Sequence, residues 1–205
     1  MTPREIYTLF KNKDGSEAIA GIATLEAVVS LVKEDNPKTV LELGGGLGTI
    51  SYAILKNSNA TLDIYEHNEY CRNELKKNLK GVEDRYTIIT DYVYLPPKRE
   101  YDLIVVDGGK GSGKYQGTGY PQLIAAYLQS LSSIKTIFIE GQRKSQKYWI
   151  LEALHSRYIY KPTKYLDPLG GNKIGVRIDC KPSGGGKLGR FLCEVNHILR
   201  RNSVY

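Results

Sequence analysis

Short apolar runs alternate with helical patterns of apolar residues along most of this 205-residue chain. The most continuous run covers 101–107 and is typical of a parallel strand that is covered on both faces. Between such runs, apolar residues at spacings of three and four predict helices. The pattern predicts strands at 39–43, 61–66, 86–90, 101–107, 136–140, 158–160 and 174–179, and between them helices at 50–55, 68–79, 122–131 and 145–158.

This alternation indicates an α/β fold with a doubly wound, mostly parallel, seven-stranded sheet. The last two strands surround a Pro-Leu-Gly-Gly-Asn turn at 168–172, so we expect an antiparallel last strand. Near the N-terminus, Thr2 and Pro3 predict a short helix, and Ser16 is expected to cap a longer helix that ends before Pro37. We therefore expect one domain over 1–181, beginning with a helical extension at 1–37.

The last residues, 182–205, differ in character: a Gly-rich linker leads into a basic amphipathic helix. We expect this helix to dock on the same domain. A homodimer through the helix, or a contact with nucleic acid or a membrane, are the alternatives. The apolar side chains form one stripe, Leu188, Phe191, Leu192, Val195, Ile198 and Leu199, and the surrounding cations are Lys187, Arg190, Arg200 and Arg201.

Composition places the chain among ordinary globular proteins, with 41% hydrophobic and 25% charged residues. No apolar run approaches the roughly 20 residues of a membrane span, so we expect no membrane association. The three cysteines, Cys71, Cys180 and Cys193, are scattered, which predicts reduced thiols and a cytoplasmic location. The net charge of +7 favours an anionic partner, although many proteins without such a partner carry a similar charge.

Candidate chemistry begins where the first strand ends. Glu42 is followed by glycines at alternate positions, Gly44, Gly46 and Gly48, and then by a helical pattern. A strand, a glycine turn and a helix bring backbone N–H groups and a helix N-terminus close to a ligand. Thr49 stands where the dinucleotide-binding fingerprint needs its third glycine. The alternative is a tight turn that binds nothing.

Acids also follow the later strands. Glu66 ends the second predicted strand, Asp91 follows the third and Asp107 ends the fourth. A carboxylate at the end of the second strand can accept hydrogen bonds from both hydroxyls of a ribose.

The acid-x-Gly-x-Gly-x-Gly turn resembles motif I of the class I S-adenosylmethionine (SAM)-dependent methyltransferases. The long helix before it and Val106-Asp107-Gly108-Gly109-Lys110 are similar to the small catechol and caffeoyl-coenzyme A type O-methyltransferases. The resemblance implies SAM as cofactor and a small or conjugated substrate. Its implied cofactor-binding residues are Glu42 at the methionine end, Gly44, Gly46 and Gly48 beneath the sulfonium, Glu66 with His67 at the ribose, Asp91 and Tyr92 at the adenine, and Asp107. Asp107 and Lys110 are the implied catalytic residues.

The family completes a metal site with an Asp-Asn pair after the fifth strand, where this chain has Glu140 and Gly141. We therefore assign no metal ligands and leave the use of a divalent metal open. In the glycine-rich segment 108–119, Gly108 to Lys114 imitates a phosphate-binding loop, but Tyr115 stands where the hydroxyl ligand is needed. We therefore interpret the segment as a mobile active-site loop.

Several functions remain open beside methylation of a small acceptor. They are an RNA- or protein-directed methyltransferase, a module that binds the cofactor together with nucleic acid or protein and has no catalysis, and an aminopropyl transferase. The cations that follow the fourth and fifth strands are expected to steer an anionic substrate, and they are Lys110, Lys114, Arg143, Lys144 and Lys147.

Overall fold

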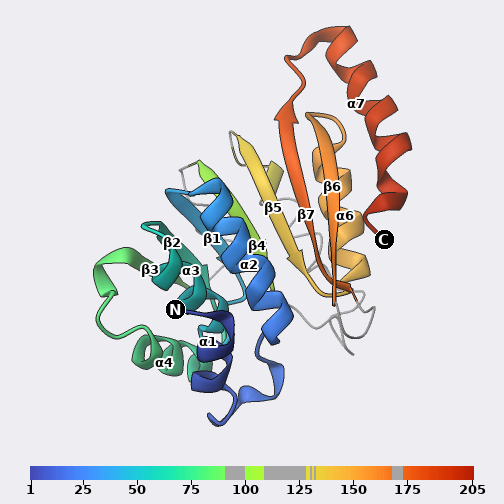
Figure 1. Ribbon diagram of the computed structural model, residues 1–205. Helices are drawn as coiled ribbons and strands as arrows, with labels where there is room; N and C mark the ends of the chain where they lie inside the picture. The colour runs from blue at the N-terminus through green and yellow to red at the C-terminus, as the bar shows by residue number, and fades with distance from the viewer. Residues whose placement is uncertain (91–99, 109–127, 130, 132, 168–172) are drawn as a thin grey trace. The chain divides into compact units, whose positions relative to one another are not determined.

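The computed structural model describes residues 1–90, 100–108, 128–129, 131, 133–167 and 173–205 (Figure 1). Seven strands form one sheet in the order β3-β2-β1-β4-β5-β7-β6. Strand order reverses between β1 and β4, which is where open α/β sheets place their ligands. The predicted seven-stranded α/β sheet is confirmed. The strands are β1 (Thr39–Leu43), β2 (Thr61–Tyr65), β3 (Tyr86–Ile89), β4 (Tyr101–Val106), β5 (Ile134–Glu140), β6 (Tyr158–Leu166) and β7 (Lys173–Pro182).

The chain divides into two compact units, and the first contains Met1–Asp91 and Val105–Gly108. In it, β1 pairs with β2 and β2 pairs with β3, both in parallel. Apolar side chains of β1 such as Val40 and Leu41 are fully buried, as expected for a parallel strand covered on both faces. The helices of this unit are α1 (Pro3–Phe10), α2 (Ile22–Asp35), α3 (Thr49–Asn57) and α4 (Glu69–Asn78), with short turns η1 (Ser16–Ala18) and η2 (Glu83–Arg85).

The start of α1 agrees with the sequence, whereas the expected start of the second helix is wrong. The Thr2 side chain accepts from the Glu5 N–H and the Glu5 carboxylate accepts from the Thr2 N–H, which is a capping box. Ser16 instead begins η1, and its hydroxyl donates to the Lys11 carbonyl. The chain is extended at Gly21, so α2 begins only at Ile22.

The second unit contains Tyr92–Ile104 and Gly109–Tyr205. Here β5 pairs with β7 and β6 pairs with β7, both antiparallel, which confirms the expected antiparallel end of the sheet. Both β6 and β7 are longer than predicted, and β7 runs on to Pro182, inside the stretch predicted as a linker. The helices are α6 (Lys144–Leu154) and α7 (Gly186–Arg200), followed by η4 (Arg201–Ser203).

The helix predicted at 122–131 lies almost entirely outside the described residues. Helix α6 ends at Leu154, four residues earlier than predicted at Tyr158, because the chain must reverse there to start β6. Among the described helices, none combines the length and the apolar character that a membrane span requires.

Candidate cofactor-binding site

The site starts with Glu42, a carboxylate buried inside the sheet. Its side chain is completely inaccessible to solvent, and the Ser51 hydroxyl of α3 donates to its Oε2 atom. Within the described residues, Oε1 of Glu42 has no hydrogen-bond partner. Burial raises the pKa of Glu42 well above its usual range; the Ser51 hydrogen bond opposes this, while the nearby charges of Asp107 and Glu66 raise it further. A positively charged group beside Glu42 would relieve this unfavourable electrostatic environment.

Packing and backbone conformation explain why positions 44 and 48 are glycines. At Gly44, with φ of +102°, an added Cβ would lie 2.1 Å from Cα of Gly108. Only a glycine lets the end of β1 approach the backbone after β4, where the Gly108 N–H donates to the Leu43 carbonyl. Gly48, with φ of +88°, is the N-cap of α3.

Gly46 is different because no packing contact with the described residues explains a glycine there. Its φ is +51°, and an added Cβ would meet no described atom within 4 Å. Its N–H donates to Glu66 Oε2 at 2.8 Å, so the turn is held from the side while no described atom fills the space at its Cα. Of the three alternating glycines, Gly46 is therefore the best placed to face a ligand.

Glu66 directly follows β2 and accepts a hydrogen bond from this turn. Its side chain is nearly buried, and its Oε1 accepts the Asn68 N–H at 2.7 Å while Oε2 accepts the Gly46 N–H. Each carboxylate oxygen has a second lone pair, so both can still accept a hydrogen bond from a ligand hydroxyl. Glu66 therefore keeps the acceptor capacity that a pair of hydroxyls, such as those of a ribose, would need.

The structure brings most of the residues implied by the resemblance into one region of the first unit. Asp107 is half-buried directly after β4, and its N–H donates to the Leu43 carbonyl at 3.0 Å. His67 is 76% exposed, with Nδ1 3.7 Å from Glu66 Oε1. Asp91, Tyr92 and Lys110 lie outside the described residues.

Charge at this turn distinguishes between ligand classes. Glu42, Glu66 and Asp107 are close enough for the latter two to raise the pKa of Glu42. A helix N-terminus behind a glycine turn normally suits a phosphate, but the charges of Glu66 and Asp107 repel added negative charge. The site is therefore better suited to a ligand that combines hydroxyls with positive charge than to a pyrophosphate.

Several solved structures share this fold. They include the S-adenosylhomocysteine (SAH)-bound methyltransferase PaMTH1 from Podospora anserina, at 17% identity and a TM-score of 0.64, with 87% of each chain covered. The O-methyltransferase TomG from Streptomyces achromogenes, in complex with SAM, has 13% identity and a TM-score of 0.62, covering 88% of this chain and 87% of TomG. An O-methyltransferase from Bacillus cereus, in complex with SAH, has 13% identity and a TM-score of 0.65, covering 87% of this chain and 89% of that one. The chain has the class I methyltransferase fold.

Identities of this size establish the fold alone. No protein-family model matches the sequence, and no curated protein sequence matches it either. What this methyltransferase fold does in this chain therefore has to be argued from its own residues.

Sequence reasoning missed four residues that build the site. The Ser51 hydroxyl donates to the Glu42 carboxylate, the Asn68 N–H donates to the Glu66 carboxylate, and the backbone of Gly108 packs against Gly44. Gly45 is needed because an added Cβ would lie 2.5 Å from Ile64. Only Ser51 carried a usable signal, a hydroxyl on the apolar face of a predicted helix; the other contacts join residues whose closeness depends on the fold.

The five cations expected to steer an anionic substrate differ in the contacts that they make. Arg143 donates to Glu140 Oε2 at 2.9 Å, and Lys147, only 1% exposed, donates to the Gly141 carbonyl at 2.9 Å. Lys144 is exposed, while Lys110 and Lys114 lie outside the described residues. Two of the five cations are thus engaged within the second unit, which weakens the case for steering from α6.

No group of three or more His, Cys, Asp or Glu side chains that could hold a metal occurs in the described ranges. Glu140 forms an ion pair with Arg143. In the O-methyltransferase family that the sequence resembles, this position carries a further metal ligand. The use of a divalent metal therefore stays open.

Proposed function

We propose that this chain is a SAM-dependent methyltransferase that methylates an oxygen of a small or conjugated substrate. The observation that carries the proposal is the set of three carboxyl groups, Glu42, Glu66 and Asp107, around a glycine turn in which no described atom fills the space at Gly46. SAM carries both a ribose diol and positive charge, so it matches the acceptors and the negative potential of this turn. The SAM- and SAH-bound structures of the same fold support the choice.

Each residue has a distinct part in this proposal. Glu66 accepts the ribose hydroxyls with the lone pairs left by Gly46 and Asn68. Glu42 balances the positive charge at the methionine end. Asp91 and Tyr92 are proposed to hold the adenine, and His67 to border the ribose.

SAM supplies a methyl group bound to a positively charged sulfur. Because methyl transfer requires acceptor, methyl and sulfur to be aligned, most of the chain's contribution is positioning. Asp107 is proposed to orient the acceptor hydroxyl and, with Lys110, to take up its proton. An anionic substrate remains part of the proposal on the strength of the net charge of +7.

Calorimetry with SAH tests the cofactor assignment. Glu66→Gln removes one acceptor, and Gly46→Val places a branched side chain in the open space, so each should weaken SAH binding at least about tenfold. Glu69→Gln is the matched control, because Glu69 is an exposed acid three residues from Glu66. NAD⁺ should give no binding heat. SAH binding that is the same in all three variants and the parent would refute the assignment.

Transfer of labelled methyl from SAM tests the acceptor class. The protein is incubated with size-fractionated cell extract, and label is measured in small-molecule, RNA and protein fractions. Label in the small-molecule fraction, with less label per bound cofactor in Asp107→Asn than in the parent, supports the proposal. Label only in the RNA or protein fraction would show that the methyl acceptor is RNA or protein and not a small molecule. SAH binding with no label in any fraction would instead indicate a module that binds the cofactor without catalysis.

A further inference from the structure

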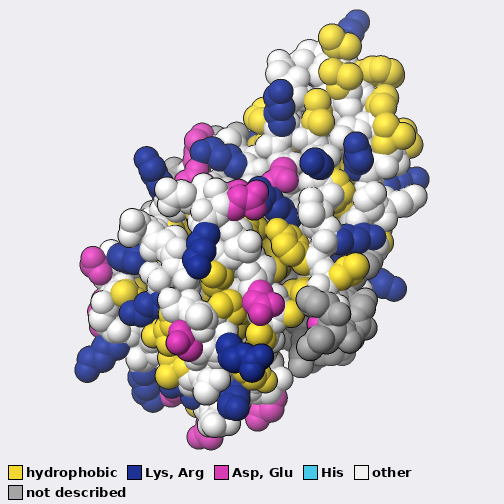
Figure 2. Space-filling view, viewed as in Figure 1, with side chains coloured by type: hydrophobic (Ala, Val, Ile, Leu, Met, Phe, Trp, Pro, Cys, Tyr) yellow, Lys and Arg dark blue, Asp and Glu magenta, His cyan; other side chains and the backbone are white. Residues whose placement is uncertain are grey.

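Helix α7 presents its apolar side to solvent. Leu188 and Leu199 are each 70% exposed, Ile198 is 63% exposed and Phe191 is 58% exposed. Figure 2 shows hydrophobic side chains gathered over this helix. With Leu192 and Val195, which are also exposed, these four residues form what we call the α7 stripe.

The opposite side of α7 is the one that docks, on β6 at the edge of the sheet. The Tyr160 N–H donates to Asn196 Oδ1 at 2.9 Å, and Asn196 Nδ2 donates to the Tyr160 carbonyl at 3.1 Å. Cys193 is fully buried, and an added Cβ at Gly189 would lie 2.8 Å from the Ser183 carbonyl. The expected docking on the same domain thus occurs through a small and polar face, because an edge strand offers unpaired backbone groups that Asn196 can satisfy.

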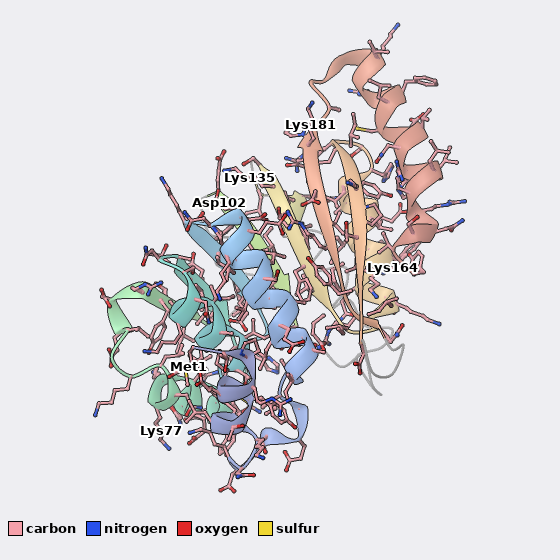
Figure 3. All side chains as sticks on the ribbon, in the orientation of Figure 1. Met1, Lys77, Asp102, Lys135, Lys164 and Lys181 are labelled. Atoms are coloured by element: carbon pink, nitrogen blue, oxygen red, sulfur yellow. The ribbon has the colours of Figure 1, made fainter. Side chains whose placement is uncertain are left out.

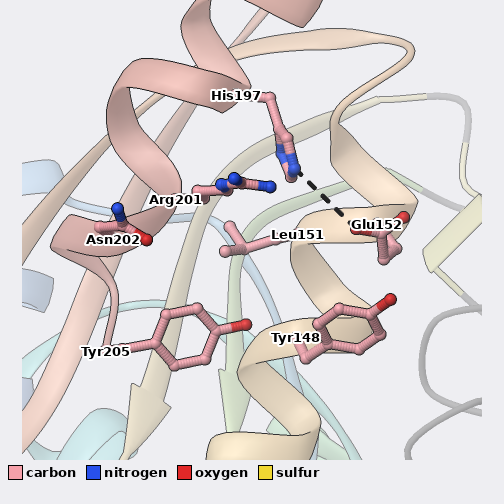
Figure 4. Close-up of a pocket in the computed structure, with 7 residues that line it drawn as sticks. All are labelled: Tyr148, Leu151, Glu152, His197, Arg201, Asn202 and Tyr205. Carbon is pink, nitrogen blue, oxygen red and sulfur yellow. Dashed lines mark ion pairs between the residues drawn. The ribbon is translucent and has the colours of Figure 1, made fainter.

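Further contacts fix the orientation of the helix. The Tyr160 hydroxyl lies 3.0 Å from His197 Nδ1, and Lys164 Nζ donates to the Tyr205 carbonyl at 2.5 Å (Lys164 is labelled in Figure 3). His197 and Arg201 face Glu152 and Tyr148 of α6 across a cavity of about 240 Å³ (Figure 4). Turning the stripe inward would break all of these contacts, so α7 holds the stripe outward.

Single exposed apolar residues are common on protein surfaces, but the α7 stripe is a contiguous apolar patch of larger area. From the exposed fractions, its six side chains present on the order of 600 Å², the upper end for one patch on a soluble monomer. Two such surfaces would bury roughly 1,200 Å², the lower limit of a stable protein interface. An identical stripe would therefore bury about the area that a small stable dimer needs.

The spacing within the stripe favours a helix as its partner. Positions 188, 191, 192, 195, 198 and 199 repeat an i, i+3, i+4 pattern every seven residues, as in paired helices. A lipid surface would need cations along the border of the stripe. At about 100° per residue, Arg190, Arg200 and Arg201 lie more than about 100° from its centre, and only Lys187 lies near its border.

We propose that the α7 stripe is the contact surface for a second copy of this chain, which forms a homodimer by pairing α7 with α7. The inference does not depend on the proposed function, because it uses only α6, α7, β6 and the last residues. A surface made of one helix can pair with its own copy around a two-fold axis, the commonest symmetry of soluble oligomers.

Analytical ultracentrifugation of the full chain over a range of micromolar concentrations tests the proposal. The parent should approach twice the 23.0 kDa chain mass as concentration rises. Phe191→Gln with Ile198→Gln should weaken the dimer at least about tenfold. Arg190→Gln with Arg200→Gln is the control, because it places the same two side chains on the same helix outside the stripe. Circular dichroism should show the same helix content in all three proteins.

A parent that stays monomeric at every concentration would overturn the proposal, as would a stripe variant that dimerises like the parent. Flotation with phosphatidylcholine and phosphatidylglycerol vesicles examines the other occupant. A monomeric parent that floats with the vesicles, and a stripe variant that does not, would make lipid the partner in place of a second copy.

Discussion

Substituting alanine at Gly44 and at Gly46 should have very different effects on stability, although the two glycines stand two residues apart in one motif. At Gly44, φ is +102° and the new Cβ would lie 2.1 Å from Cα of Gly108. At Gly46, φ is +51° and the new Cβ would have no described atom within 4 Å. The first change adds a clash to backbone strain, while the second adds strain alone.

Typical magnitudes separate the two variants. A non-glycine residue in the left-handed region costs about 1–2 kcal/mol, which is the whole cost expected for Gly46→Ala. Gly44→Ala adds about 1–3 kcal/mol for forcing atoms into a filled space, because backbone atoms cannot move aside as a side chain can. We expect Gly44→Ala to be less stable than Gly46→Ala by about 2 kcal/mol.

Urea unfolding followed by circular dichroism, without ligand, measures the difference. With a slope of about 2 kcal/mol per molar urea, the midpoints of the two variants should differ by about 1 M. Equal midpoints would show that the backbone after β4 does not approach Gly44 as described, and the structural reason given for this glycine would then be wrong.

Two further changes test individual side chains. Burial raises the pKa of Glu42, so the folded state holds its proton more tightly than the unfolded state. Stability from this group is then present below its unfolded pKa and is lost as pH rises through the folded pKa. Glu42→Gln should therefore gain stability relative to the parent as pH is raised in urea titrations, and a difference independent of pH would contradict this. Asn196→Ala leaves the backbone groups of Tyr160 without their side-chain partner and should lower the free energy of unfolding by about 1–3 kcal/mol. The control Glu194→Ala, at an exposed position of α7, should lower it by less than about 0.5 kcal/mol in the same assay. Similar losses in both variants would refute the role of Asn196.

Local pattern was sufficient for the elements that frame the candidate site. The apolar run of β1, the glycines after it and the acid at Glu66 predicted a strand, a turn and a carboxylate after the second strand, and the structure places the Glu66 carboxylate against that turn. This worked because strand burial, glycine turns and helix caps depend on residues close in sequence. The start of the second helix was misjudged because Ser16 found a partner in the preceding turn.

Tertiary structure alone decided the different uses of the glycines and the orientation of α7. The requirement for glycine at 44 comes from Gly108, far along the chain, so no local signal could distinguish Gly44 from Gly46. The apolar stripe by itself predicts that α7 buries Leu188 and Phe191, but β6 is an edge strand with backbone groups to satisfy. Hydrogen bonding to that edge selected the face with Asn196 and Cys193, and so the side that is most apolar in the sequence became the surface of the folded chain.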